Sequence, residues 1–252
     1  MKRPQFFHLL IVICACVLFL SDCSSIARRS HTIRIMTFNL HHCEGTDSVY
    51  DVARIARFMQ DHKADIILCQ EVDRGYSDRS NNENQPKILK EMLGYHSFYG
   101  PNIGEIYGNL ILSRFPLLDT RNVPLPNTEN KEPRGIIVST VIVNGRSLSL
   151  LNTHLSAFSR KNRDEQVVYL QKLISELKKP VILGADFNCK PSDQLKPLLE
   201  KDNLVSTREI IHIDEAIDDI LVSPGLRKKV IGGTVIPTTY SDHPAYVIDI
   251  SL

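Results

Sequence analysis

Val181-Ile-Leu-Gly-Ala-Asp-Phe-Asn188 is the stretch of sequence that decides the fold. The apolar run from Val181 to Leu183 has the character of a buried strand and is followed by a glycine. Asp186 and Asn188 come next, two residues apart, so an extended backbone places both on one face. A lone Asp-x-Asn pair is usually a polar turn that closes a core strand. A functional interpretation is favoured here because other apolar runs of the chain end in similar residues.

Those other runs predict a protein rich in strands. Residues 33–38 alternate in the manner of a strand and end at Asn39, residues 65–70 end at Glu71, and residues 147–152 are followed by Thr153-His154. Further strands are expected at 108–113, 134–143, 217–222, 230–236 and 245–250. Asn144-Gly145 is the strongest hairpin signal and predicts antiparallel neighbours.

Two amphipathic helices are expected between these strands. Apolar residues recur at helical spacing from Val49 to Met59, with Asp47 or Ser48 as the N-cap, and again between Arg160 and Lys179. A short helix is expected near 194–200. Many strands with few helices favour two sheets packed face to face, with the helices outside.

The N-terminus has the pattern of an export signal. Lys2 and Arg3 precede an apolar block, Phe6 to Leu20, that is short for a membrane span. Residues 20–25 resemble a bacterial lipobox in which Cys23 would be lipidated, although Asp22 replaces the usual small residue. Ile13-Cys14-Ala15-Cys16, which fits the small-residue rule better but leaves a short apolar core, and an uncleaved anchor are the alternatives. We therefore expect a signal at 1–22, a linker at 23–31 and one domain at 32–252 of an exported envelope, periplasmic or secreted protein.

Charge and cysteine content exclude several classes of protein. The formal net charge is +1, and no local basic patch indicates nucleic-acid binding. The cysteines outside the expected signal (Cys23, Cys43, Cys69 and Cys189) lack the Cys-x-x-Cys spacing of a structural zinc site, and their pairing cannot be deduced. Cys69 lies in an apolar strand, where a buried small side chain is expected.

The polar residues at the strand ends suit phosphate ester chemistry. They are Asn39, Glu71, His154, Asp186, Asn188, Asp218, Asp242 and His243. Oxygen ligands in this number favour a hard cation such as Mg²⁺. The two histidines suit acid/base or charge-stabilising roles. Zinc, which would use the histidines as ligands, is the weaker alternative.

These residues belong to an ordered set of motifs that resembles the endonuclease/exonuclease/phosphatase superfamily. The set runs from about Thr32 to the C-terminus and comprises Thr37-Phe-Asn39, Gln70-Glu71, Gly108-Asn-Leu-Ile-Leu-Ser-Arg-Phe-Pro116, Asn152-Thr-His154, Gly184-Ala-Asp-Phe-Asn188, Ile217-Asp218 and Ser241-Asp-His243. The resemblance implies an α/β fold of the deoxyribonuclease I type: a four-layer α/β/β/α sandwich of two mixed, mainly antiparallel sheets. It also implies that residues 32–252 are a catalytic domain for metal-dependent hydrolysis of phosphate esters.

The resemblance also implies a role for each residue. Glu71 would be the principal Mg²⁺ ligand, with Asn39 and Asp242 beside it, and Mn²⁺ or Ca²⁺ are possible substitutes. The other implied roles are a His243–Asp218 pair at the phosphate, Asp186 aligning or deprotonating the attacking water, Asn188 stabilising charge, His154 assisting from the opposite side, and Arg134 contacting the phosphate. How His243 and Asp186 divide the acid/base work is left open.

A metal-dependent phosphodiesterase or phosphatase is the favoured function, with a diester as the expected substrate. An extracellular nuclease and a catalytically inactive binding module on the same fold are the alternatives. Lipid headgroups, nucleic acid and small phosphate esters are all expected substrate classes, and we expect a monomer attached to a membrane through its lipidated N-terminus. A flat, tyrosine-rich rim around residues 76–84 and 99–107 would suit a membrane-borne substrate, and a narrow pit would suit a small ester. His41, His42 and Asp219 are expected to be surface residues.

Overall fold

The first of two sheets contains the β1–β2 pair, which carries the Asn39 and Glu71 ends. This computed structural model describes residues 32–178, 180–200 and 203–252. The strand order of the first sheet is β11-β12-β1-β2-β4-β3. β1 runs parallel to β2 and antiparallel to β12. The strands are β1 (Thr32–Asn39), β2 (Ile66–Asp73), β3 (His96–Ile103), β4 (Tyr107–Ser113), β11 (Val230–Ile236) and β12 (Ala245–Ser251). The expected signal, linker and lipidated Cys23 lie outside the described residues.

The second sheet is built around the Val181 strand. Its order is β5-β6-β7-β8-β10-β9, and β7 runs parallel to β8 while the other neighbours are antiparallel. Asn144 and Gly145 both have positive φ, at 52° and 75°, as a tight turn between β6 and β7 requires. The predicted hairpin is therefore confirmed. The strands are β5 (Leu118–Pro124), β6 (Gly135–Val143), β7 (Arg146–His154), β8 (Val181–Asp186), β9 (Val205–Ser206) and β10 (Asp218–Val222).

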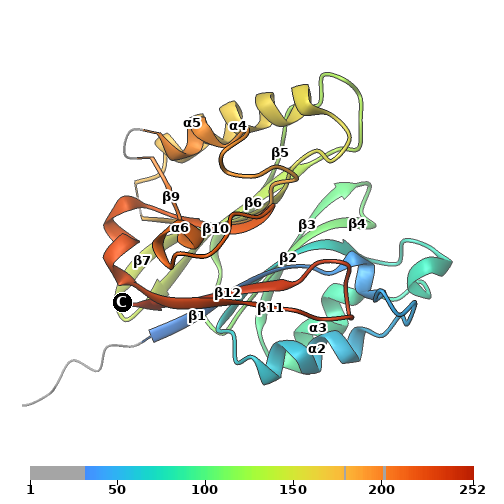
Figure 1. Cartoon of the computed structure of the whole chain (residues 1–252). Helices are drawn as coiled ribbons and strands as arrows, with labels where there is room; N and C mark the ends of the chain where they lie inside the picture. The colour runs from blue at the N-terminus through green and yellow to red at the C-terminus, as the bar shows by residue number, and fades with distance from the viewer. Residues whose placement is uncertain (1–31, 179, 201–202) are drawn as a thin grey trace, which may run out of the picture. The chain divides into compact units, whose positions relative to one another are not determined.

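Helices cover the outer face of each sheet, which confirms the α/β/β/α sandwich. α2 (Val52–Asp61) and α3 (Gln85–Leu93) lie against the first sheet, and α4 (Arg160–Ser175) and α5 (Lys196–Leu199) lie against the second (Figure 1). The remaining short helices are α6 (Thr207–Ile210) and the 3₁₀ turns His41–Cys43, Asp78–Ser80 and Pro224–Lys229. No helix of the described residues combines the length and apolar character needed to cross a bilayer.

The N-cap of α2 differs from the expectation. Asp51, whose side chain accepts a hydrogen bond from the Arg54 amide, caps the helix. Asp47 instead accepts from the Arg54 guanidinium and from the Val49 amide, because the chain turns once more before the helix begins. α3, β3 and β5 were not expected, since their sequences mix polar and apolar residues without a clear period.

The two sheets meet at a core that brings their strand ends together. Ile35, Leu68, Ile137 and Ile220 are fully buried between them. Gly184 allows a close approach of the sheets, because a Cβ built there would lie 2.4 Å from Leu68 Cδ1.

Polar contacts between the sheets add to this packing. Gln70 Nε2 donates to Asn152 Oδ1 at 2.7 Å, and Asn152 Nδ2 donates to the Cys69 and Leu110 carbonyls. The motif residues Gln70 and Asn152 therefore join the sheets directly beneath the polar strand ends. Cys69 is buried as expected, and Cys43, Cys69 and Cys189 are all free thiols.

Candidate active site

Strand register aligns the predicted residues of the second sheet. His154 of β7 is paired with Asp186 of β8, and Asp186 is paired with Asp218 of β10. Residues paired across a ladder project to the same face of a sheet. Three neighbouring strands therefore present an imidazole and two carboxylates side by side at one end of the sheet.

Glu71 of the first sheet reaches the same place through a bulge. The register of β2 with β4 shifts between Cys69 and Val72, and Glu71 lies in that interval with φ at 54°. A bulge adds an unpaired residue and re-aims its side chain, often beside an active site. Glu71 therefore has a strained left-handed backbone conformation, and this conformation turns its carboxylate toward the second sheet.

Asn39 joins the two carboxylates from opposite sheets. Its Nδ2 donates to Glu71 Oε1 and to Asp186 Oδ2, both at 3.0 Å, and its Oδ1 accepts from the His41 amide at 3.0 Å. The amide nitrogen of this fully buried residue therefore faces the site. In this position the amide group reduces the repulsion between the Glu71 and Asp186 carboxylates. This role differs from the metal ligation expected of Asn39, and that ligation stays a prediction.

Asp242 lies at the rim of the site rather than inside it. Its side chain is 49% exposed, and its Oδ1 is 4.0 Å from both His243 Nε2 and His41 Nδ1. The carboxylate oxygens of Glu71 and Asp242 are the kind of ligand that a hard cation prefers. Asp186, Asp218 and His243 form another group whose ligand atoms lie within 4.8 Å of one another, but His243 Nδ1 and Asp218 Oδ2 are already bonded to each other.

His243 and Asp218 form the expected pair. His243 Nδ1 lies 2.8 Å from Asp218 Oδ2, and Nε2 lies 3.7 Å from Asp186 Oδ2. Burial lowers the pKa of His243, but the hydrogen bond and charge of Asp218, with the charge of Asp186, outweigh it and raise the pKa to about 9. Burial and the Asp218 charge raise the pKa of Asp186 to about 6. Near neutral pH His243 is thus an imidazolium, and the nearby Asp186 carboxylate is more basic than usual.

The backbone of Asp218 is held from behind. Arg208, which is 4% exposed, donates from Nε to the Asp218 carbonyl at 2.8 Å and stacks over the Tyr246 ring. This contact fixes the start of β10 and hence the direction of the Asp218 carboxylate.

His154 has a hydrogen-bond donor at each ring nitrogen. Arg134 Nη1 lies 3.1 Å from Nδ1, and Asn188 Nδ2 lies 2.8 Å from Nε2. Burial, together with the charges of Arg134 and His243, holds the pKa of His154 well below its usual value, so the ring is neutral. A neutral imidazole has only one acceptor nitrogen. Only one of the two donors can therefore hydrogen-bond to the ring in either tautomer.

Arg134 and Asn188 are both held in place. Arg134 is 4% exposed, and its Nη1 lies 2.7 Å from Glu132 Oε1. Asn188 has φ at 50°, its backbone N–H donates to Asp186 Oδ1 at 2.9 Å, and its Nδ2 also donates to the Leu155 carbonyl. These contacts aim two N–H donors at the place where Asp186 and His154 meet.

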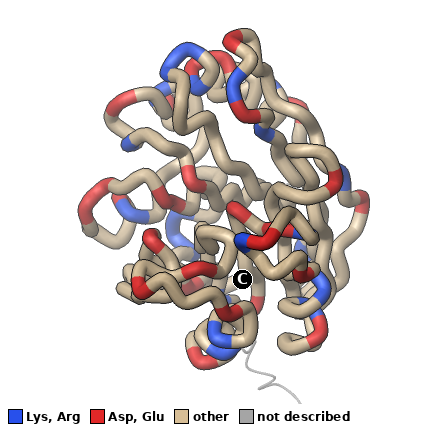
Figure 2. The backbone as a smooth tube through the Cα atoms, turned by 90° about the vertical axis from the view of Figure 1, so that its right-hand side faces the viewer, with Lys and Arg blue, Asp and Glu red and all other residues tan. Residues whose placement is uncertain are grey.

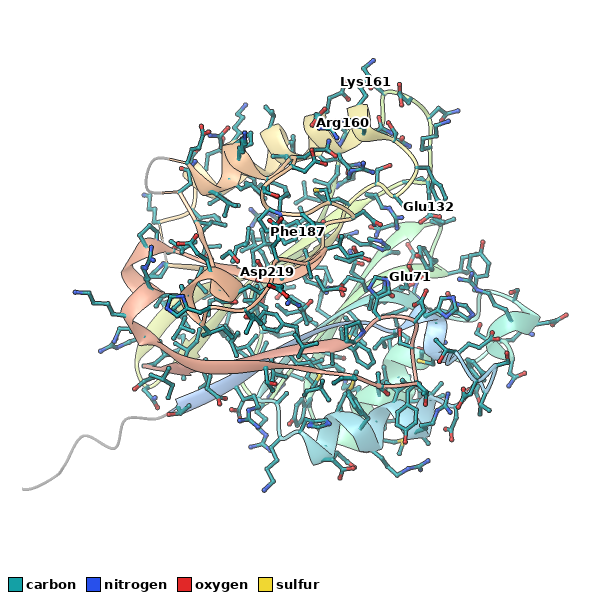
Figure 3. The ribbon with its side chains drawn as sticks, viewed as in Figure 1. Glu71, Glu132, Arg160, Lys161, Phe187 and Asp219 are labelled. Carbon is teal, nitrogen blue, oxygen red and sulfur yellow. The ribbon has the colours of Figure 1, made fainter. Side chains whose placement is uncertain are left out.

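A pocket of about 210 Å³ joins these groups. Glu71, Arg134, His154, Asp186, Asn188 and His243 line one part of it, and Tyr76, Arg79, Ile103, Tyr107, Glu132, Ala157 and Phe158 line the rest. Glu71 and Glu132, which lie on loops and strand ends of different sheets, are seen at the same end of the sandwich in Figure 3. The structure thus brings Glu71 and His243 into one pocket, as the hydrolase hypothesis requires. Asn39 contacts the pocket residues Glu71 and Asp186, Asp218 contacts His243, and Asp242 lies beside it.

Several lining residues were not predicted from the sequence. Tyr76, Arg79 and Tyr107 lie in the two tyrosine-containing stretches that were expected to shape the rim, so a signal for them existed. Glu132 stands two residues before Arg134 and was overlooked. Phe158 had no signal, because an isolated phenylalanine after a strand is usually a core residue.

The expectation of surface positions for Asp219 and His42 is wrong. Asp219 is fully buried and accepts hydrogen bonds from Ser206 Oγ and the Ile220 amide, and burial raises its pKa to about 7. His42 is 8% exposed, because its neighbour in the fold, Gln85, binds its carbonyl and buries the turn. His41 is partly exposed, with 36% of its side chain accessible.

Comparisons with known proteins agree with this geometry. Residues 36–243 match the sequence profile of the endonuclease/exonuclease/phosphatase family. A search of curated protein sequences finds no match.

Among solved structures, an endonuclease/exonuclease/phosphatase from Beutenbergia cavernae DSM 12333 is similar with a TM-score of 0.76 and 24% identity, covering 88% of this chain and 72% of that one. A mannosyl-6-phosphatase from Bacteroides thetaiotaomicron VPI-5482 gives 0.70 and 21%, covering 87% and 100%. The catalytic domain of human nocturnin, with a bound sulfate anion, gives 0.67 and 21%, covering 87% and 93%. At these identities the likeness concerns the fold.

Proposed function

Since the chain belongs to the endonuclease/exonuclease/phosphatase family, whose members hydrolyse phosphate esters, we propose that it is a divalent-metal-dependent hydrolase of compact phosphate esters. The observation that carries this proposal is the convergence of Glu71, Asp186 and His243, from three distant parts of the chain, on one pocket. Solved structures with a similar fold include both a mannosyl-6-phosphatase and nocturnin. The fold therefore does not determine the substrate, and the substrate has to be inferred from the residues that line the pocket.

Glu71 would hold the metal ion, with Asp242 as a second oxygen ligand. The donor set fits Mg²⁺, which is bound by one or two carboxylates together with water and substrate phosphate, and Mn²⁺ or Ca²⁺ would accept the same ligands. When bound, the ion would neutralise negative charge on the phosphate and on the departing oxygen. Asn39 keeps the Glu71 and Asp186 carboxylates at a fixed separation, whether or not its own oxygen turns to the ion.

Asp186 is positioned to act on the attacking water. Its Oδ2 lies 3.4 Å from His154 Nε2 and 3.7 Å from His243 Nε2, so a water bound to this carboxylate would lie beside both rings. The water oxygen forms the new bond to phosphorus as one of its protons passes to Asp186. The ester P–O bond breaks, and the departing oxygen leaves with the electron pair of that bond and takes up a proton.

The remaining polar groups stabilise the phosphate during this exchange. The charge of the His243 imidazolium and the N–H donors of Asn188 and Arg134 face the pocket, where negative charge develops on the non-bridging oxygens. These donors are already fixed by protein contacts, so little reorganisation is needed when the phosphate enters. The division of labour left open by the sequence is thus resolved in this proposal: Asp186 acts as base and His243 as a cation.

The alternatives fit the molecule less well. Acidic and basic residues are interspersed over the backbone (Figure 2), and the net charge of +1 supplies no general attraction for nucleic acid. A pocket of about 210 Å³ is smaller than the roughly 300–1,000 Å³ typical of drug-sized ligands and resembles a pit rather than a flat rim. A binding module without activity has no need of the paired His243–Asp218 and the strained Glu71.

A panel of phosphate esters tests the proposal. Purified protein lacking residues 1–22 is assayed with mono- and diesters in the presence of Mg²⁺, Mn²⁺ or Ca²⁺, and with EDTA. We expect metal-dependent phosphate release that falls by about 10²–10⁴ in His243→Ala, while the matched variant His96→Ala, which changes an exposed histidine outside the pocket, stays active. Equal rates for wild type and His243→Ala would refute the mechanism, and plasmid nicking in place of ester hydrolysis would favour the nuclease.

We further propose that the protein is exported and acts as a monomer at a membrane, to which a lipidated Cys23 attaches it. The apolar block after Lys2 and Arg3 and the lipobox-like residues 20–25 support this proposal. Mass spectrometry of the N-terminal peptide from cells tests it: a diacylglyceryl group on Cys23 is the expected result, and an unmodified peptide beginning elsewhere would refute it.

A further inference from the structure

The pocket has a second half that the proposed chemistry does not use. Besides the residues that would act on phosphorus, it is lined by side chains from both sheets that we call the distal wall: Tyr76, Arg79, Tyr107, Glu132 and Phe158. Within this pocket, the distal wall is the part that remains for the organic group of a bound ester. The chemistry of the distal wall therefore indicates which kind of organic group the pocket can bind.

One end of the distal wall, formed by Tyr107 and by Arg79 over its ring, lies on the Glu71 side of the site. Tyr107 begins β4 opposite Asp73 of β2, just beyond the Glu71 bulge. Burial, and next the charge of Glu71, raise the pKa of Tyr107. In the proposed reaction Asp186 holds the water, and the departing group must leave on the opposite side of phosphorus. A wall beside Glu71 is thus placed to meet the departing group.

Arg79 is held in the distal wall by an acidic residue that balances its charge. Its Nε and Nη2 donate to the two oxygens of Asp73 at 2.9 and 2.7 Å, and Asp73 is fully buried. The guanidinium also stacks on the Tyr76 ring, 4.1 Å from its centroid. Asp73 balances the charge of Arg79, and the N–H groups of Nη1 are left to donate toward the pocket. Because a buried carboxylate already balances its charge, these N–H groups can donate to a neutral oxygen of a ligand.

Glu132 and Phe158 complete a surface of mixed polarity. Glu132 balances the charge of Arg134 and offers carboxylate lone pairs to hydroxyl donors. Phe158 is 69% exposed although it lines the pocket, so its ring is free to cover an apolar C–H face. Arg79, the arginine of the distal wall, and Arg134 beside it thus each have an acidic partner, and the described residues of the wall offer no unpaired cation for another phosphate.

From these observations we propose that the distal wall binds a neutral, hydroxyl-bearing ring, a sugar or a cyclic polyol, as the departing group of a phosphate monoester. Arg79 would donate to one ring oxygen, Glu132 would accept from a hydroxyl, and Phe158 would lie against the C–H face of the ring. The inference rests on the proposed function for the hydrolytic step, but the binding that it describes does not require turnover.

Hydrolysis of matched monoesters tests the specificity. The wild-type protein with Mg²⁺ is given glucose 6-phosphate, inositol 1-phosphate and ethyl phosphate, which share the phosphate and differ in the departing group. We expect kcat/KM for at least one ring substrate to exceed that for ethyl phosphate by about tenfold or more, the effect of one or two hydrogen bonds. Phe158→Ala and Arg79→Lys should each lower this ratio several-fold. The matched variants Ile231→Ala, at an exposed apolar residue, and Arg57→Lys, at another arginine–aspartate pair, should keep it.

Binding separates this inference from the proposed function. Calorimetric titration measures binding to the distal wall without catalysis. The ligands are the non-hydrolysable methylenephosphonate analogues of glucose 6-phosphate and inositol 1-phosphate, and their affinities are compared with that of methylphosphonate. Tighter binding of a ring analogue that Phe158→Ala weakens would support the wall even if no ester were hydrolysed. Equal binding of ring analogues and methylphosphonate, or a preference for dinucleotides over ring monoesters, would overturn it, whatever the hydrolytic activity.

Discussion

Replacing Asp218 by asparagine isolates the charge that maintains His243 as a cation. The asparagine oxygen can still accept a hydrogen bond from His243 Nδ1, so the 2.8 Å contact need not be lost. The charge is lost, however, and it is one of the causes that raise the pKa of His243 from 6.5 to about 9. With burial then acting against the cation, we expect the pKa of His243 in the metal-free variant to fall to its ordinary value or below.

The magnitude follows from the size of that shift. A rise from 6.5 to about 9 corresponds to about 3 kcal/mol of differential stabilisation of the imidazolium. Because the folded pKa is raised, this stability is fully present below pH 6.5 and is lost as the pH rises through 9. Asp218→Asn should lose much of this stabilisation at pH 7, and turnover at neutral pH should fall by roughly 10²–10³, the usual scale for loss of one electrostatic stabiliser.

Nuclear magnetic resonance of the imidazole protons gives the test. Metal-free wild type and Asp218→Asn are titrated between pH 5 and 10, and Asp193→Asn serves as the control because Asp193 is a partly exposed carboxylate paired with Arg160 away from the pocket. We expect one histidine of the wild type to titrate near 9 and to move by two units or more in Asp218→Asn only. An unchanged titration in Asp218→Asn, with activity retained, would refute the role given to the pair.

Three other changes follow from the same structure. Gly184→Ala places a methyl group against Leu68 between the sheets and should lower the free energy of unfolding by about 1–3 kcal/mol in urea titration, and a neutral effect would show that the sheets can separate freely. The folded pKa of Asp219, about 7, lies above its ordinary 3.8, so wild-type stability should decline by about 4 kcal/mol as the pH rises from 4 through 7. Asp219→Asn should flatten this decline and be more stable than wild type at pH 8, and a wild-type profile without that decline would contradict the burial of an acid. EDTA should abolish phosphate release, and Glu71→Gln should raise the Mg²⁺ concentration needed to restore it by tenfold or more, whereas an unchanged metal requirement would place the ion elsewhere.

The sequence by itself determined the apolar strands of the core, their polar ends and the family. Apolar runs, the Asn144-Gly145 turn and the amphipathic face of α4 are local signals, and each was found where expected. The order of the motifs implied the sandwich, and it named the residues that the fold brings together around Asp186. These features could be predicted because each depends on a few neighbouring residues.

Only the tertiary structure decided how those residues meet. The burial of Asp219 depends on Ser206, which arrives from a two-residue strand with no signal of its own. The inward turn of Glu71 depends on a bulge opposite β4, and the distal wall depends on loops from both sheets that place Arg79 and Phe158 in one pocket. Strand register and loop paths arise from packing between residues far apart in the chain, and no local pattern encodes such distances.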